Sequence, residues 1–204
     1  TIARQYGSGG KTIAAMLAKD LGINCYGREI LKMASEESGI NERLFGMSDE
    51  KLKHSVLMKL LKRPYEGDLI PPESSGFVSD DNLFNYQAKV IKELAESESC
   101  VIVGRCADYV LRDFPNVISV FIHADLDKRI RRLAKVYNLT DSAAKDQIQK
   151  SDKKRASYYN YYTSKKWGDS ASYNLCLDSG VLGVEGCVEM IKAAIDLKKK
   201  TKAW

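Results

Sequence analysis

The segment Thr1-Ile2-Ala3-Arg4-Gln5-Tyr6-Gly7-Ser8-Gly9-Gly10-Lys11-Thr12 decides the fold class of this chain. Its first three residues are typical of the end of a buried strand, and a glycine-rich loop follows them directly. A helix follows the loop, because Ile13, Leu17 and Leu21 are spaced to share one face and Gly22 can end the helix. Glycines let backbone N–H groups point into one concavity, and the positive end of the helix also attracts anions. The segment therefore predicts a loop that holds the triphosphate of a nucleotide.

The candidate nucleotide-binding residues of this loop are Gly7, Ser8, Gly9, Gly10, Lys11 and Thr12. We expect the Lys11 ammonium to reach the terminal phosphates and the Thr12 hydroxyl to ligate magnesium. The usual pattern is G-x-x-x-x-G-K-[ST], and here Gln5 stands in place of the first glycine. The alternative is a glycine-rich turn before an ordinary helix, with Lys11 in solvent. The apolar strand before the loop and the amphipathic helix after it favour phosphate binding.

Short apolar strands alternate with helices along the rest of the chain. Strands are predicted at 23–26, 100–103, 117–122 and 175–177, and helices at 27–38, from Ser79 to about 94, at 126–137, from Thr140 to about 162, and at 184–195. This alternation predicts an α/β fold of the P-loop NTPase type, with a five-stranded parallel sheet flanked by helices on both faces. The length of 204 residues suits a single domain over 1–204. Because Thr1 already lies in a strand, we expect the natural chain to have residues upstream.

Residues 41–78 have a less regular pattern. A helix is predicted around 48–61, and the polar, proline-containing stretch 63–79 is predicted to be a mobile loop.

Composition narrows the class of protein. Apolar residues make up 44% and charged residues 29%, which is ordinary for a soluble enzyme, and no apolar run is long enough to span a bilayer. The net charge of +5 is compatible with a phosphate-rich small ligand, and it is too small to indicate binding to a nucleic acid. The five cysteines include no C-x-x-C pair, so we expect free thiols in a reducing cytoplasm and no metal site built from them.

Arginines supply the second signal. Arg105 follows the strand 100–103, and ligands of open α/β sheets bind at the carboxyl ends of the strands. A guanidinium there can fork onto a phosphate, although it could equally cap the sheet through backbone carbonyls.

The helices after the fourth strand carry further charges. Arg129 and Arg132 share one helix face, and Asp152, Arg155 and Tyr159 share a face of the next helix. Solvated ion pairs are the ordinary explanation for an isolated helix. Beside a phosphate-binding loop, such arginines can close over the transferring phosphoryl group and exclude water.

The order of these pieces resembles that of the cytidylate kinases, within the P-loop nucleoside monophosphate kinases, and most closely their cytidylate kinase-like branch. The segments that carry the resemblance are 2–10, 102–105, 114–117, Arg129, Asp152 with Arg155, and 177–185. The resemblance covers most of the chain, and it rests on the order and spacing of the segments together.

By that resemblance, Lys11 and Thr12 serve magnesium-bound ATP, Arg105 and Arg155 hold an acceptor monophosphate, and Asp152 recognises its base or sugar. Arg129 or Arg132 belongs to a closing segment, and with Lys11 and Arg155 they form the expected catalytic set. The acceptor region is expected within 27–78 and a lid within 137–169. The implied reaction is transfer of the γ-phosphoryl group of ATP to CMP, dCMP or a similar acceptor, by a cytoplasmic monomer or weak homodimer.

Three departures from the family pattern concern the acceptor side. Cys106 stands where the family's G-R-D has its aspartate, Gly27 follows Tyr26 where relatives often carry an aspartate, and 41–78 does not resemble the acceptor-binding part of true cytidylate kinases. Two other readings therefore stay open. One is a P-loop kinase of a hydroxylated metabolite, for which Asp108, Asp152 and Asp169 are the candidate bases. The other is a nucleotide-binding protein without turnover.

Overall fold

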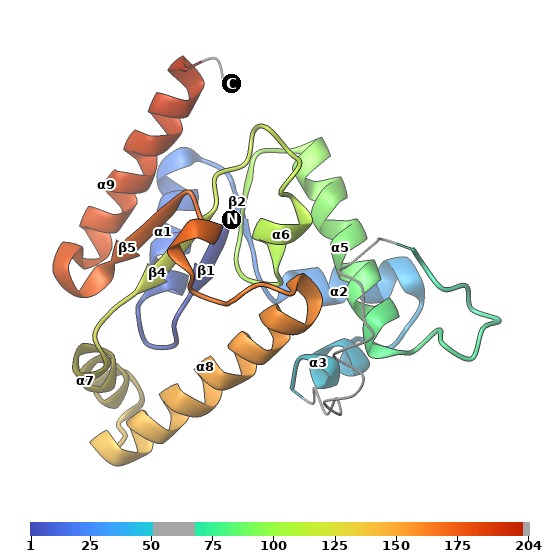
Figure 1. Cartoon of the computed structure of the whole chain (residues 1–204), viewed down its shortest axis with the longest axis horizontal. Helices are drawn as coiled ribbons and strands as arrows, with labels where there is room; N and C mark the ends of the chain where they lie inside the picture. The colour runs from blue at the N-terminus through green and yellow to red at the C-terminus, as the bar shows by residue number, and fades with distance from the viewer. Residues whose placement is uncertain (51–67, 202–204) are drawn as a thin grey trace.

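Figure 1 shows the computed structural model of the chain, which describes residues 1–50 and 68–201. The strands are β1 (Ile2–Arg4), β2 (Asn24–Tyr26), β3 (Cys100–Ile102), β4 (Val120–His123) and β5 (Leu175–Asp178). The helices are α1 (Gly10–Leu21), α2 (Glu29–Ser38), α3 (Glu42–Glu50), α5 (Asp80–Ser97), α6 (Ala107–Val110), α7 (Leu126–Tyr137), α8 (Asp141–Thr163) and α9 (Ser179–Lys200), with a short 3₁₀ turn at Ser170–Ser172. Strands and helices alternate, so the predicted α/β class is confirmed.

The prediction of one five-stranded sheet is wrong. The strands form a three-stranded parallel sheet in the order β1-β4-β5 and a two-stranded parallel sheet, β2-β3. One parallel bridge, between Ile2 and Val103, joins them, and the Gly104 amide donates to the Ile2 carbonyl at 3.0 Å. At this register the residues opposite Cys100 and Val101 would precede Thr1, so β1 and β3 overlap only at their ends. The sequence pattern predicts where the strands lie, but it does not predict the register between β1 and β3.

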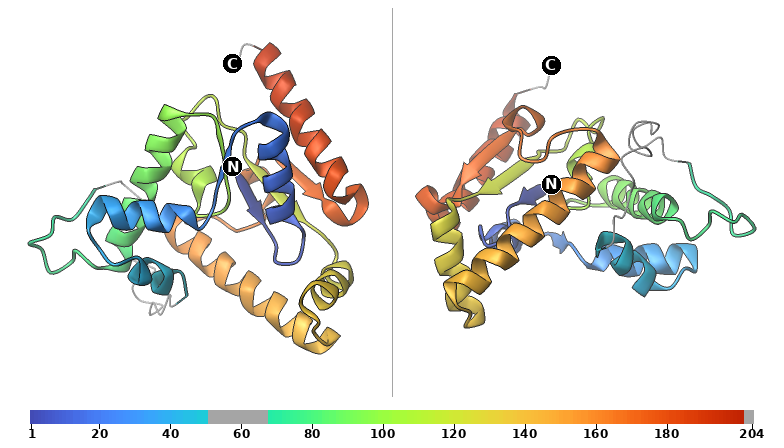
Figure 2. Two further views of the ribbon diagram at one scale, coloured as in Figure 1. Left: turned by 180° about the vertical axis from the view of Figure 1, so that it is seen from behind. Right: turned by 60° about the horizontal axis from the view of Figure 1, so that its bottom comes forward.

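Both faces of the strands are covered, as the sequence predicts. Ile2, Val120 and Ile122 face a core formed with α1 and α9. The alternate residues Ala3 and Phe121 face a second core, which α2, α5 and the end of α8 complete. This period of two follows from the pleat of a strand. Figure 2 shows α1 and α9 side by side on one side of the strands, and α2 and α5 together on the other.

Capping residues begin or end three helices at the positions that the sequence predicts. Gly22 adopts φ 65° at the end of α1, the left-handed conformation that favours glycine. The Ser79 side chain accepts from the Asn82 amide at the start of α5, and the Thr140 side chain accepts from the Ala143 amide at the start of α8.

The region 41–78 is described only in part. α3 covers 42–50, earlier than the helix predicted around 48–61, of which 51–61 lies outside the described residues. In the described part of the stretch 63–79, Asn82 accepts from the Ile70 amide and donates to the carbonyls of Ile70 and Phe77. The buried Asn82 side chain therefore fixes the chain that enters α5.

Among residues 1–50 and 68–201, no helix combines the length and the apolar character needed to cross a membrane.

Candidate active site

The candidate site lies at the carboxyl ends of the parallel strands. The glycine-rich loop that is predicted to bind phosphate follows β1, Gly27 and Arg28 follow β2, and Gly104 to Cys106 follow β3. Helix α8 crosses this edge of the strands (Figures 1 and 2). A cavity of about 610 Å³ lies between these segments. It is lined by cations (Arg4, Lys11, Arg28, Arg105, Lys154 and Arg155), by two carboxylates (Glu29 and Asp108) and by aromatic rings (Tyr158, Tyr159 and Trp167).

The loop after β1 has glycine where its backbone needs glycine. Gly7 and Gly9 adopt φ 81° and 82°, whereas Gln5 is not among the residues with positive φ. The Gln5 side chain instead accepts from the Ala124 amide at 3.2 Å, and its own amide donates to the Ile122 carbonyl at 2.9 Å. Gln5, which replaces the first glycine of the usual pattern, therefore connects the loop to the end of β4.

Helix α1 presents an open N-terminus to this loop. Its N-cap, Gly9, provides no side-chain cap, and the Ile13 amide is the first to bond back to the Gly9 carbonyl. The amides of the first helical turn, from Gly10 to Thr12, therefore have no partner within the helix, which is the arrangement that binds phosphate. The Lys11 and Thr12 side chains are exposed beside them.

Ser8 is held inside the protein. Its hydroxyl donates to the Gln5 carbonyl at 2.8 Å, and its carbonyl accepts from the Ser179 hydroxyl at 2.6 Å. The same Ser179 hydroxyl lies 3.0 Å from the His123 carbonyl. Ser179 therefore joins the loop to β4 and α9, a bracing role that the sequence analysis missed because the residues are far apart in the chain.

Arg129 and Asp152 form a clamp under the phosphate-binding loop. Arg129 Nη1 lies 2.6 Å from Asp152 Oδ2, and their side chains are only 9% and 18% exposed. Asp152 Oδ1 accepts from the Tyr6 amide at 2.7 Å, and Arg129 donates to the carbonyls of Tyr6 and Ala124 at 3.2 and 3.0 Å. Both residues were predicted to serve the phosphoryl group or the acceptor. Their contacts connect α7 and α8 to the backbone of the loop, and their roles toward the phosphoryl group and the acceptor stay predictions.

Arg132, on the same helix as Arg129, lies over the phosphate-binding loop. A Cβ atom at Gly9 would lie 2.5 Å from its Nη1, and its Nη2 lies 3.5 Å from the Thr12 hydroxyl. Glycine at position 9 therefore leaves room for a cation beside the open helix end.

Arg105 and Arg155 both line the cavity, and acceptor binding by them stays a prediction. Arg105 Nη1 donates to the buried Gln87 side chain at 3.3 Å. Arg155 Nη1 donates to the Arg4 carbonyl at 3.0 Å, and its guanidinium carbon lies 5.3 Å from the centre of the Tyr6 ring. Both guanidinium groups are thus positioned by residues of the cavity wall.

The four tyrosines near the end of α8 fall into two pairs, one packed in the core and one lining the cavity. Tyr161 and Tyr162 are buried, and the Tyr162 ring stacks on Phe84 with centroids 3.9 Å apart, so these residues anchor the end of α8 in the core. Tyr158 and Tyr159 line the cavity. The segment predicted as a lid, 137–169, therefore has its second half packed into the protein.

Asp108 is a carboxylate of the cavity wall, two residues beyond Cys106. The Tyr159 hydroxyl donates to Asp108 Oδ2 at 2.7 Å. Burial raises the pKa of Asp108 above its usual range, while the Tyr159 hydrogen bond acts in the opposite direction. Burial and the neighbouring Asp108 also raise the pKa of Tyr159, which keeps its proton on the donor. From the sequence alone, Asp108 is only one of three candidate bases. Of those three, it is the one that lines the cavity.

We expect Asp108→Asn to raise the melting temperature at neutral pH. A carboxyl whose pKa is raised in the folded state binds its proton more tightly there than in the unfolded chain, so stability is lost as the pH rises through that pKa. Asparagine removes this cost and can still accept from Tyr159. Thermal unfolding of both proteins at neutral and acidic pH checks this. A wild-type advantage at neutral pH would contradict it.

Comparison with known proteins agrees with this architecture. The family described as "Cytidylate kinase-like family" matches residues 1–181. A cytidylate kinase of Archaeoglobus fulgidus is 25% identical over 205 residues, covering 98% of this chain and 95% of that protein. The crystal structure of an uncharacterized protein from Eubacterium ventriosum superposes with a TM-score of 0.70 at 30% identity, over 96% of each chain. A shikimate kinase from Bacteroides thetaiotaomicron shares the fold, with a TM-score of 0.52 at 14% identity and 96% of each chain covered. The chain therefore belongs to the cytidylate kinase-like family.

Proposed function

We propose that the protein is a P-loop kinase that transfers the γ-phosphoryl group of ATP to a nucleoside monophosphate of the CMP or dCMP type. The observation that carries the proposal is one shared cavity, in which Lys11 of the phosphate-binding loop lies with Arg105 and Arg155 at the ends of other elements. The donor site and an acceptor site rich in cations thus adjoin each other. The name of the Archaeoglobus relative, a cytidylate kinase, supports the choice of acceptor.

The donor side would bind the triphosphate through the loop amides and the first turn of α1. Gly9 leaves room for the Arg132 guanidinium beside the loop, and Lys11 and Thr12 are exposed at the helix end. The Thr12 hydroxyl would ligate Mg²⁺, an ion that usually takes few protein ligands and completes its shell with phosphates and water. Bound Mg²⁺ would neutralise part of the negative charge of the triphosphate.

The acceptor side would bind a phosphate dianion through Arg105 and Arg155. A phosphate oxygen is already anionic, so the transfer needs positioning and charge neutralisation more than a strong base. Arg132, beside Gly9 and Thr12, would neutralise charge on the γ-phosphate from the α7 side.

The first test measures ADP formation from magnesium-ATP with CMP, dCMP, UMP, AMP or GMP as acceptor. We expect turnover with one or two pyrimidine nucleotides well above the rate with water alone. No turnover with any of the five, at concentrations where ATP binding is verified, would overturn the proposal. That result would leave two alternatives, a kinase with a hydroxylated acceptor and a nucleotide-binding protein without turnover.

We expect Arg105→Ala to weaken the acceptor selectively. Loss of charge-assisted hydrogen bonds to a phosphate should raise the KM of the monophosphate by roughly 10- to 100-fold, with little change in the KM of ATP. Steady-state kinetics with each substrate varied in turn separates the two constants. A rise confined to the KM of ATP would show that the two sites were assigned the wrong way round.

Asp108 favours a second candidate function, phosphorylation of a hydroxylated metabolite. Such an acceptor needs a base, and the Asp108–Tyr159 pair provides a carboxylate on the cavity wall. Turnover with a hydroxylated acid or sugar, lost in Asp108→Asn, would select this function if all five monophosphates are inactive.

A further inference from the structure

Arg4 occupies the junction between the donor loop and the acceptor cavity. It is the last residue of β1, and its side chain passes between Gly10 and Gly104. A Cβ atom at Gly10 would lie 2.5 Å from Arg4 Cβ and 2.9 Å from Cγ. A Cβ atom at Gly104 would overlap Arg4 Nη1 and lie 3.3 Å from Cζ. The two glycines therefore leave a passage that the Arg4 side chain fills.

The ends of this passage belong to the two proposed sites. Gly10 is the first residue of α1 and precedes Lys11, whereas Gly104 precedes Arg105. Arg4 lines the same cavity as Lys11 and Arg105. The Arg155 guanidinium donates to the Arg4 carbonyl at 3.0 Å, which fixes the backbone from which the side chain projects. The stem of the Arg4 side chain thus lies against Gly10 on the donor side, and its guanidinium group lies beside Gly104 on the acceptor side of the cavity that Lys11 also lines.

We propose that Arg4 is a catalytic residue that contacts the phosphoryl group while it passes from donor to acceptor; this inference rests on the proposed kinase function. In that step, the bond between the γ-phosphorus and the β–γ bridging oxygen breaks, and its electron pair leaves with ADP. An oxygen of the acceptor phosphate donates the pair that forms the new bond to phosphorus. Charge shifts along this line, and a fixed cation beside it lowers the barrier more than it strengthens the binding of either nucleotide.

Arg4→Met tests the charge while it keeps an unbranched side chain in the passage. We expect kcat with magnesium-ATP and CMP to fall by about 10²- to 10⁴-fold, with the dissociation constant of ATP changed by less than about threefold. If the wild-type enzyme transfers phosphate and Arg4→Met has the same kcat, the role of Arg4 is overturned and the proposed function stands.

Gly104→Ala tests the position of the guanidinium without altering its charge. The added methyl group would meet Arg4 Nη1, so we expect kcat to fall here as well. Gly22→Ala is the matched control, because Gly22 has a similar φ of 65° and no atom within 4 Å of the added Cβ. Both variants carry the strain of a positive φ, and both should lose melting temperature. Equal kcat in the two alanine variants would contradict the inference.

A binding experiment gives a readout that does not need turnover. Adenosine and cytidine joined by five phosphates would span both sites and the junction between them. Calorimetry should show at least tenfold weaker binding of this compound to Arg4→Met than to wild type, with ATP binding preserved. Equal affinity would overturn the inference. A wild-type protein that neither transfers phosphate nor binds the bridged compound would overturn the proposed function, and the inference with it.

Discussion

Lys11→Ala should reduce kcat by about 10²- to 10³-fold or more while the protein remains folded. Lys11 is exposed at the first turn of α1, beside helix amides that have no partner within the helix. Its ammonium would neutralise the terminal phosphates as the γ-phosphoryl group leaves, a contribution that no other residue of α1 can replace. Because the side chain is exposed, its truncation leaves the cores on both faces of the strands intact.

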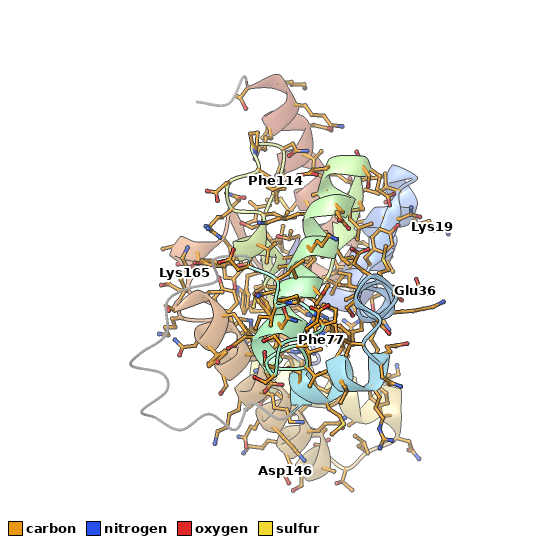
Figure 3. The ribbon with its side chains drawn as sticks, turned by 90° about the vertical axis from the view of Figure 1, so that its right-hand side faces the viewer. Lys19, Glu36, Phe77, Phe114, Asp146 and Lys165 are labelled. Atoms are coloured by element: carbon orange, nitrogen blue, oxygen red, sulfur yellow. The ribbon has the colours of Figure 1, made fainter. Side chains whose placement is uncertain are left out.

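The matched control is Lys19→Ala. Lys19 is an exposed lysine in the last turn of the same helix and lies at the edge of the molecule in Figure 3. We expect both variants to keep the wild-type circular dichroism spectrum and a melting temperature within a few degrees of wild type. Turnover should collapse only in Lys11→Ala. Comparable rates for the two variants would show that the loop after β1 does not hold the donor triphosphate.

Local features of the fold could be predicted from the sequence because their causes are local. Gly22, Ser79 and Thr140 each end or begin a helix through their own backbone conformation or side chain, and all three lie where the sequence places them. The pairing of the strands could not be predicted in the same way. The single bridge between Ile2 and Val103 depends on a register between segments about a hundred residues apart, which no local pattern encodes.

The features of the candidate site can also be separated into those with local causes and those that depend on residues far apart in the chain. The positive φ angles of Gly7 and Gly9 follow from the local needs of the backbone, so the glycine-rich loop could be predicted from the sequence, whereas its binding of phosphate stays a prediction. The contacts of Asp152 with Tyr6 and Arg129 span 146 and 23 residues, and only the packing of α8 under the loop brings these groups together. The position of Arg4 could not be predicted for a similar reason, because its side chain lies against Gly104, which is distant in the chain.

Asp152→Ala should destabilise the fold by about 3 kcal/mol, because it leaves the nearly buried Arg129 charge without its carboxylate. For a chain of this length, that corresponds to a fall in melting temperature of roughly 6–12 °C. The change also removes the acceptor of the Tyr6 amide, so the loop should hold ATP less tightly. Asp146→Ala is the control, because Asp146 is an exposed aspartate of the same helix, labelled in Figure 3. It should alter stability by less than about 0.5 kcal/mol.

Two measurements distinguish a clamp from an acceptor-binding residue at position 152. If Asp152 positions the loop, its loss should raise the dissociation constant of ATP and lower stability, while the KM of the monophosphate changes little. If it recognises the base or sugar, as the family resemblance implies, the KM of the monophosphate should rise with stability unchanged. The double variant Arg129→Met/Asp152→Ala adds an internal test, because removing both charges leaves no buried ion. It should be less destabilised than the sum of the single variants, by at least about 1 kcal/mol. Additive losses would show that the ion pair does not connect α7 and α8 to the loop energetically.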